Sequence, residues 1–429
     1  MLTAVAGINW GDEGKGRMTD VLSEGQDVVC RYQGGNNAGH TIMNDRGRYV
    51  LNLLPSGILR DKVVNVLGPG MVLDLAHLAG EIRTLREQGL EITPMNLKVS
   101  DRACICLPYH VSQDIWEEDR LGDRRYGTTR KGISPAYGDK YMKKILRMSD
   151  LFSPDALRDK VKDLLEWKHL LLDNYEGKLP MVRDLIVWLT EYGEIVKPFV
   201  TNTTSYLSDA IDAGKRILFE TQLGALRDID YGIYPYTTSS CTLSAYATTG
   251  AGIPWARLDK VIGVMKAYSS CVGEGPFTAE LFGLQAEILQ EPGSQFGVAT
   301  ARPRRVGAFD IPASRYGVKI QGADELALTK LDILEGMAKI PVCVAYEIDG
   351  NHTEDFPAGD MLLRAKPVFD YLEGFSMPEG KHISQCRSRH DLPKEAQAYI
   401  EYIEKAVSCP ITYVSLGPDR DDYINWREK

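Results

Sequence analysis

The N-terminal segment constrains the fold more than any other part of the chain. An apolar run from Leu2 to Ile8 leads directly into Gly7-Ile8-Asn9-Trp10-Gly11-Asp12-Glu13-Gly14-Lys15-Gly16, and a helix is predicted to follow. A strand that ends in glycines and a lysine before a helix aims backbone N–H groups at a phosphate. The loop is not a Walker A motif, since Asn9 and Gly16 occupy its outer positions. Taken alone, it is equally consistent with a tight strand-to-helix turn.

Asp12 favours the phosphate interpretation of this loop. A carboxylate inside an anion-binding loop is electrostatically unfavourable unless it holds a metal ion or takes up a proton. A magnesium nucleotide meets the first condition, because Mg²⁺ binds one or two carboxylates together with phosphate oxygens. The sequence therefore predicts a site for a magnesium-bound nucleotide.

Strands and helices alternate along the chain. The stretch from Leu73 to Gln88 has apolar residues on one helical face and ends at Gly89. Ser153-Pro154-Asp155 is typical of a helix start, and Leu392 to Val407 has an amphipathic pattern. Buried strands are predicted at Leu2 to Ile8, Val63 to Leu67, Arg216 to Glu220, Lys260 to Tyr268, Ile340 to Tyr346 and Pro410 to Leu416. This pattern predicts an α/β fold with a large, mainly parallel central sheet and helices on both faces.

Long polar loops rich in glycine interrupt the pattern at 31–41, 122–140, 221–253 and 296–308. Loops of this length in a compact domain are usually functional or disordered, and their threonine and arginine content favours function. No repeat or low-complexity linker divides the chain. We therefore expect one domain that spans residues 1–429.

Composition excludes some classes of function. The formal net charge is −9, which argues against general binding of nucleic acid or of a membrane surface. The N-terminus has no signal-peptide pattern, and no apolar stretch is long enough to span a bilayer. The eight cysteines have no zinc-site spacing. These features predict a cytoplasmic protein with reduced thiols.

Two segments carry a specific resemblance. They are Trp10-Gly11-Asp12-Glu13-Gly14-Lys15-Gly16 and Arg31-Tyr32-Gln33-Gly34-Gly35-Asn36-Asn37-Ala38-Gly39-His40-Thr41. Further landmarks reach nearly the end of the chain, among them Gly127-Thr128-Thr129, Tyr234-Pro235-Tyr236, Thr329-Lys330-Leu331-Asp332 and Gly417-Pro418-Asp419-Arg420. The chain resembles the adenylosuccinate synthetase family. The resemblance implies a homodimeric, Mg²⁺-dependent ligase that uses GTP to join L-aspartate to the 6-oxo carbon of a purine nucleotide, inosine monophosphate (IMP).

The resemblance also implies roles for individual residues. Asp12 matches the base that removes the purine N1 proton, and it matches a magnesium ligand together with the backbone carbonyl of Gly39. His40 matches the acid that stabilises charge on the transferring phosphoryl group, and Lys15 adds a positive charge. The full set implied for GTP is Gly14, Lys15, Gly16, Gly39, His40, Thr41, Lys330, Asp332, Ser415 and Gly417.

Guanine and aspartate each have a matching segment. The Asp332 carboxylate can accept two hydrogen bonds from the guanine N1–H and 2-amino groups, which adenine lacks. Thr300, Arg302 and Arg304 match the loop that holds aspartate, where planar guanidinium groups bind carboxylates bidentately.

The residues implied for the acceptor nucleotide are partly changed from the family pattern. They are Asn37, Thr129, Lys143 (reaching from the partner subunit), Gln222, Leu223, Thr238 and Arg302. Leu223 stands where the family has a glutamine, Lys143 where it has an arginine, and Arg130 and Lys131 where it has glycine and arginine. Three hypotheses stay open. IMP remains the acceptor after compensating changes, or the acceptor is another 6-oxo compound such as a deoxy or 2-amino purine nucleotide or a specialised metabolite, or the chain is a non-catalytic GTP-binding relative.

Overall fold

The computed structural model describes residues 1–44, 47–172, 178–290 and 304–428. Its central sheet has ten strands. Every neighbouring pair is parallel except β19 and β20, which form one edge of the sheet. In spatial order the strands are β20 (Tyr423–Asn425), β19 (Ile411–Ser415), β15 (Glu325–Thr329), β11 (Lys260–Lys266), β1 (Leu2–Gly7), β10 (Ile217–Gly224), β2 (Val28–Arg31), β5 (Val64–Leu67), β7 (Leu97–Ser100) and β9 (Val200–Thr201). The predicted α/β class with a mainly parallel sheet is confirmed.

Alternation along the strands buries both faces of this sheet. On one face Val5, Val29 and Leu218 pack against Met18 of helix α1 (Lys15–Leu22). On the other face, residues of the same strands pack against Leu207 of α7 (Thr203–Asp212) and against α8 (Ala247–Ala251). A strand buried on both faces is apolar over most of its length, which is why these segments contain long hydrophobic runs.

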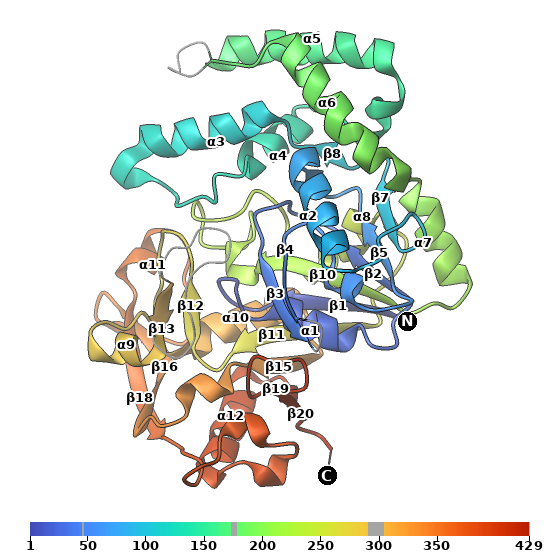
Figure 1. Ribbon diagram of the computed structural model, residues 1–429. Coiled ribbons are helices and arrows are strands. Elements are labelled where there is room, and N and C mark those ends of the chain that lie inside the picture. The colour runs from blue at the N-terminus through green and yellow to red at the C-terminus, as the bar shows by residue number, and fades with distance from the viewer. Residues whose placement is uncertain (45–46, 173–177, 291–303, 429) are drawn as a thin grey trace.

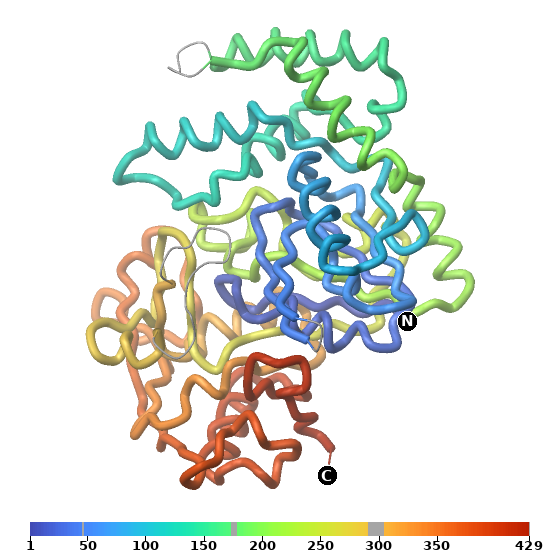
Figure 2. Tube along the Cα trace, in the orientation of Figure 1, coloured from blue at the N-terminus to red at the C-terminus, as the bar shows by residue number. Residues whose placement is uncertain are grey.

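Helices form one end of the molecule (Figure 1). They are α2 (Leu75–Glu87), α3 (Pro108–Leu121), α4 (Ile133–Tyr141), α5 (Pro154–Leu172) and α6 (Val182–Val196). Asp74 caps α2 by accepting from the backbone N–H of His77, as a carboxylate at this position does for the unpaired first turn. The C-terminal part of the chain forms the opposite end, and the blue N-terminal segment lies between the two ends (Figure 2).

A smaller sheet lies beside the central one. It consists of β14 (Phe309–Asp310), β16 (Lys339–Ile348), β17 (Asn351–Thr353) and β18 (Lys366–Glu373). Helices α10 (Ile311–Gln321) and α12 (Lys394–Val407) pack in the same core. The remaining helices and strands are α9 (Leu284–Gln290), α11 (Asp360–Arg364), β3 (His40–Asn44), β4 (Gly47–Leu51), β6 (Val72–Leu73), β8 (Cys104–Ile105), β12 (Ser269–Cys271) and β13 (Arg305–Gly307).

The structure differs from the sequence-based expectation in several places. The strand predicted at Ile340 to Tyr346 forms as β16 but pairs with β18 in the smaller sheet, since an apolar run does not specify its partner. The segments 122–140 and 221–253 are not loops throughout, because α4 begins after Gly132, whose φ of 74° caps the helix start, and α8 lies within the second segment. In the central and smaller sheets, the strands without a matching prediction are β2, β7, β9, β14, β15, β17, β18 and β20.

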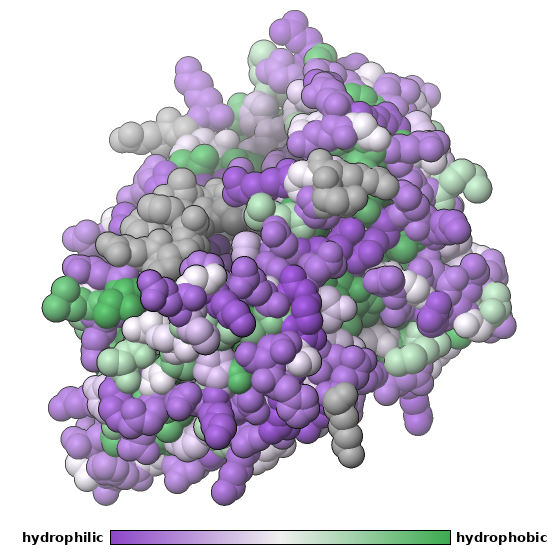
Figure 3. Space-filling model, turned by 60° about the horizontal axis from the view of Figure 1, so that its bottom comes forward, coloured by the Kyte–Doolittle hydropathy of each residue, from purple (hydrophilic) through white to green (hydrophobic). Residues whose placement is uncertain are grey.

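Two further features concern the surface of the molecule and its cysteines. Hydrophilic side chains cover most of the face shown in Figure 3. Among the described residues, no helix is both long enough and apolar enough to cross a membrane. All eight cysteines are free thiols, and seven of them are buried.

Candidate active site

A cavity of about 1000 Å³ opens at the carboxyl ends of four neighbouring strands, β10, β1, β11 and β15. Ligands of open parallel sheets bind at this edge because the strand ends and helix N-termini converge there. Most residues predicted for the site line it: Asp12, Gly14, Lys15, Gly16, Asn37, Gly39, His40, Thr41, Thr129, Leu223, Thr238, Arg304, Lys330, Asp332, Ser415 and Gly417.

Glu13 organises the loop that follows β1. Its Oε1 atom accepts from the backbone N–H groups of Asn9 (3.0 Å) and Gly11 (2.8 Å), and its Oε2 atom holds the ammonium of Lys15 at 2.5 Å. Lys15 is thereby fixed at the first position of α1, and its side chain is only 3% exposed. The helix N-terminus and this lysine together provide an anion-binding end to the cavity.

The absence of a serine or threonine at position 16 has a steric cause. A Cβ atom at Gly16 would lie 2.4 Å from the Cβ of His40. Only glycine lets β3 bring His40 against the first turn of α1. The departure from the Walker A pattern therefore makes room for a second functional side chain.

Asp12 lies between two glycines with positive φ and itself has a φ of 59°. Its Oδ2 atom accepts from Nε of Arg304 at 2.9 Å. Burial alone would raise the pKa of Asp12, but the positive charges of Arg304, Lys266 and Lys15 outweigh this effect and hold the pKa below its ordinary value. Asp12 is therefore ionised at neutral pH and can accept a proton or bind a cation.

His40 is fixed by a buried carboxylate. Its Nδ1 atom lies 2.5 Å from Oε1 of Glu220, the fourth residue of β10. Burial opposes ionisation of Glu220, but His40, Arg31 and the backbone N–H of Ser56 together lower the pKa of this carboxyl. An ionised Glu220 can only accept, so Nδ1 of His40 carries the proton. The Nε2 atom is the ring nitrogen left for the cavity.

Lys330 and Asp332 follow β15 at the far end of the cavity, near Ser415 and Gly417. The Oδ1 atom of Asp332 is buried and has no hydrogen-bond partner among the described residues. Burial raises the pKa of this carboxyl, and Lys330 opposes that shift. Because a buried acceptor without a partner is unfavourable, Asp332 fits a ligand that donates hydrogen bonds.

The acceptor end of the cavity is lined by Asn37, Thr129, Leu223 and Thr238. Leu223 reaches the cavity with a φ of 60°. Gln222 does not line it, because its side chain points inward and its Nε2 atom donates to the carbonyl of Gly35 at 2.9 Å. Gln222 therefore does not replace a glutamine at position 223. Lys143 is exposed and also lies outside the cavity lining.

Comparisons with known proteins agree with this geometry. The family model for adenylosuccinate synthetase matches residues 4–424. Adenylosuccinate synthetase of Caldanaerobacter subterraneus is 43% identical over 99% of this chain and 98% of its own length. The Streptococcus gordonii enzyme of the same name is 42% identical over 97% and 96%.

The chain belongs to the adenylosuccinate synthetase family.

Two solved structures extend the comparison. The fully ligated adenylosuccinate synthetase of Plasmodium falciparum superimposes with a TM-score of 0.91 at 33% identity, covering 99% of both chains. The succinoaminodeoxyadenylate synthetase of cyanophage S-2L matches with a TM-score of 0.61 at 19% identity, covering 99% of this chain and 95% of that one. The second likeness shows a shared fold alone.

Several cavity residues of this family member were not predicted from the sequence. Arg17 of α1 donates to Ser415, to the Gly417 carbonyl and to the Asp422 carbonyl, and so ties the helix to the C-terminal loop. Lys266 is the last residue of β11, and a charged residue that ends an apolar strand was an available signal. Arg227, which also lines the cavity, donates to the carbonyl groups of Tyr236 and Val272. Thr300 and Arg302 lie outside the described residues.

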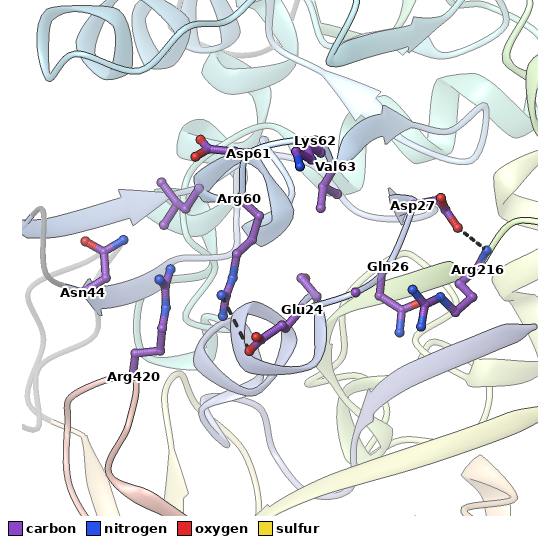
Figure 4. Close-up of a pocket in the computed structure, with 13 residues that line it drawn as sticks. Glu24, Gln26, Asp27, Asn44, Arg60, Asp61, Lys62, Val63, Arg216 and Arg420 are labelled. Carbon is purple, nitrogen blue, oxygen red and sulfur yellow. Dashed lines mark hydrogen bonds and ion pairs between the residues drawn. The ribbon is translucent and has the colours of Figure 1, made fainter.

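A second cavity, of about 500 Å³, lies at the amino ends of β2, β5 and β10 (Figure 4). It is lined by Arg60, Arg216 and Arg420 among others. Arg60 and Arg420 both contact the buried carboxylate of Asp20, and Arg60 also approaches Glu24. Two of these three cations, Arg60 and Arg420, therefore already have a carboxylate partner, and Glu24, Asp27 and Asp61 also line the cavity.

Proposed function

We propose that this protein catalyses the GTP-dependent ligation of L-aspartate to IMP, which forms adenylosuccinate, GDP and phosphate. For a chain of this family, one structural observation supports the proposal most directly. A single cavity joins a base-recognition end, at Lys330 and Asp332, to a reaction centre at Asp12 and His40 and to an acceptor end at Thr129 and Thr238. The reaction needs this arrangement, since the γ-phosphate must reach the 6-oxygen of a second nucleotide.

The first step transfers a phosphoryl group. The ionised Asp12 takes the N1 proton of IMP, which leaves negative charge on O6. O6 attacks the γ-phosphorus, the bond to the β,γ-bridging oxygen breaks, and GDP leaves. Lys15 faces the transferring group and offsets its charge. His40 offsets this charge when its Nε2 atom carries a proton in addition to Nδ1, because a neutral ring protonated on Nδ1 presents only a lone pair there. Glu220 keeps the His40 ring in the orientation that this requires.

Magnesium fits the same corner of the cavity. Asp12 provides a carboxylate beside a phosphate-binding helix N-terminus, and among the described residues only its Oδ2 atom has a protein donor. The residues that would hold the ion are Asp12 and, through its carbonyl, Gly39. When bound, Mg²⁺ neutralises charge on the phosphates.

The second step forms the carbon–nitrogen bond. Arg304 lines the cavity beside Asp12 and, with Thr300 and Arg302, would bind the two carboxylates of aspartate. This places the amine near C6 of the phosphorylated purine, where it displaces inorganic phosphate. Asp332 selects guanine for the co-substrate by accepting from N1–H and the 2-amino group.

A homodimer would complete the acceptor site. Lys143 lies outside the cavity of its own subunit, at an exposed turn with a φ of 62°. A lysine supplied by the partner would contact the phosphate of IMP as a point charge rather than as the bidentate fork of an arginine.

Phosphate release in the presence of Mg²⁺ tests the proposal. The rate should require GTP, acceptor and aspartate together, and IMP should give a higher kcat/KM than dIMP, GMP or dGMP. A higher kcat/KM with another acceptor would contradict the choice of IMP. Phosphate release that does not depend on aspartate would contradict the ligase function itself.

A further inference from the structure

Lys266 occupies a central place in the cavity that the proposed steps do not use. It ends β11, which lies between β1 and β15 in the central sheet. Its register partner on β15 is Thr329, the residue before Lys330, and the hydroxyl of Thr329 donates to the carbonyl of Glu13 at 2.5 Å. Lys266 therefore stands between the guanine-recognition segment and the loop that carries Asp12.

Within the part of the chain that the structure describes, the side chain of Lys266 has no carboxylate partner. It is 3% exposed and lines the cavity. Its ammonium donates to the hydroxyl of Ser270 and lies 5.2 Å from the centre of the Tyr268 ring. Among the described residues, no carboxylate oxygen lies within 4.0 Å of its Nζ atom. This sets it apart from Lys15, which is paired with Glu13.

The charges that face Lys266 come from three segments. Asp12 and Glu13 follow β1, Lys330 follows β15, and Arg304 precedes β13. Burial is the largest influence, and with the repulsion from Arg304 and Lys330 it lowers the pKa of Lys266 to about 7, against the attraction of the two carboxylates. A substantial fraction of the side chain is therefore neutral at physiological pH and can accept a proton.

The ligation chemistry requires such a group. Aspartate enters with an α-ammonium, which cannot attack carbon until it loses a proton. Asp12 has taken the N1 proton in the first step. The role proposed for His40 uses a ring whose Nδ1 is held by Glu220 and whose Nε2 is protonated, so His40 cannot accept a proton either. Lys266 lies near both Asp12, at the reacting purine, and Arg304, at the amino acid.

We propose that Lys266 is the base that deprotonates the α-ammonium of aspartate before it attacks C6. This role rests on the proposed function. One proton passes from the ammonium to the Nζ atom of Lys266, and the neutral amine forms the C6–N bond. The C6–O bond breaks, and the phosphate leaves with the second amine proton as hydrogen phosphate. Lys266 and Asp12 then return their protons to solvent.

Isotope exchange separates this role from a role in phosphoryl transfer. GTP labelled with ¹⁸O in the β,γ-bridge scrambles the label when the first step reverses, and this needs Mg²⁺ and IMP but no aspartate. We expect aspartate-dependent turnover of Lys266→Met to fall roughly 100-fold or more and scrambling to fall much less, because Lys266 affects the first step only through the charge that it adds beside Asp12. Lys15→Met should lose both reactions, because Lys15 faces the phosphates.

Each outcome of the isotope experiment has a different interpretation. A parallel loss of scrambling and turnover in the folded Lys266→Met protein would assign Lys266 to the first step and overturn the proposal. Wild-type turnover in this variant would overturn it as well. If the wild-type protein itself shows no scrambling with any acceptor, the proposed function fails instead.

A charge-preserving variant provides an independent test. Arginine keeps the positive charge but does not give up its proton near neutral pH. Lys266→Arg should therefore remain roughly 100-fold impaired in aspartate-dependent turnover at every pH from 6 to 9. Turnover close to the wild-type rate would show that charge alone is needed and would contradict a base.

The pH profile supplies a readout that does not depend on these substitutions folding. In the wild-type protein, kcat/KM for aspartate should decrease as the pH falls through the pKa of Lys266, which gives the profile an acid limb. This limb should lie at or above pH 7, since bound phosphates raise the pKa of Lys266. Ser270→Ala removes a hydroxyl that accepts from the ammonium form, so the limb should move to lower pH while scrambling persists. An acid limb at the same pH in Ser270→Ala and in the wild type would contradict the assignment of this limb to Lys266.

Discussion

At the scale of single residues, pairing decides which charged groups are positioned and which are free to react. Glu13 fixes Lys15, and Glu220 fixes the tautomer of His40. Asp12 is paired with Arg304, a residue of the segment proposed for aspartate, so the phosphate loop and the amino-acid loop meet at the reaction centre. Each pairing fixes the position of a polar side chain that the sequence alone does not place.

Replacement of Asp12 tests the mechanism most directly. Asp12→Asn keeps the shape and the hydrogen-bonding capacity of the side chain but removes the base and the anionic ligand. We expect kcat to fall by about 100- to 10,000-fold, with circular dichroism unchanged. Steady-state phosphate release provides the measurement, and turnover near the wild-type rate would contradict the mechanism.

Asp332 is the residue proposed to select the base of the triphosphate. Asp332→Asn loses one acceptor from guanine, so kcat/KM for GTP should fall about 10- to 100-fold. The amide can instead donate to the 2-oxo group of xanthine, and xanthosine triphosphate should become the better substrate of this variant. Kinetics with both triphosphates measure the switch; an unchanged ratio would remove Asp332 from base recognition.

The pKa of Glu220 predicts a pH effect on stability. This pKa is held below the ordinary 4.5, so ionised Glu220 stabilises the fold above that pH, and the contribution is lost as pH falls through the folded-state value. The gap in unfolding free energy between wild type and Glu220→Gln should therefore shrink as pH falls from 6 to 3. Urea titrations across this range measure it, and a gap independent of pH would contradict the ionised state.

At the scale of elements, close approach of backbone segments sets the geometry of the site. Helix α1 and strand β3 touch at Gly16 and His40, which fixes the imidazole over the helix N-terminus. A sequence pattern shows that glycine is present but not which side chain occupies the space it leaves. The Walker A template therefore fails here for a packing reason.

A serine at position 16 tests this contact. Gly16→Ser should push His40 off Glu220 and lower kcat at least about 10-fold, although serine is the residue that Walker A motifs prefer there. Gly80→Ala in α2 is the matched control, because a Cβ atom at Gly80 meets nothing within 4 Å. Its activity should equal that of the wild type. Full activity of Gly16→Ser would show that the contact is not functional.

At the scale of the whole molecule, the parallel sheet gathers distant segments at one edge. Asp12, Leu223, Lys266 and Lys330 lie at or just after the carboxyl ends of neighbouring strands, although up to about three hundred residues separate them in the chain. Exposed Lys143 lies apart from this edge, in agreement with a site completed by a second subunit.

Subunit complementation tests the shared site. Asp12→Asn and Lys143→Met homodimers should each be nearly inactive. When the two are unfolded and refolded as a mixture, half of the dimers carry both changes in separate subunits, and each of these has one intact site. Activity should recover to about a quarter of the wild-type value. No recovery would place Lys143 in its own subunit's site, and full activity of the Lys143→Met homodimer would place it outside the reaction.

The sequence by itself determined the α/β class, the phosphate loop and the family, because strand periodicity and the order of motifs are local properties of the chain. It placed most of the cavity residues only through resemblance to that family. Tertiary structure alone decided that Gln222 turns inward, that Glu220 holds His40, and that Lys266 lines the cavity with no carboxylate partner among the described residues. These features depend on strand order and on contacts between residues far apart in the chain, and no local pattern encodes either one.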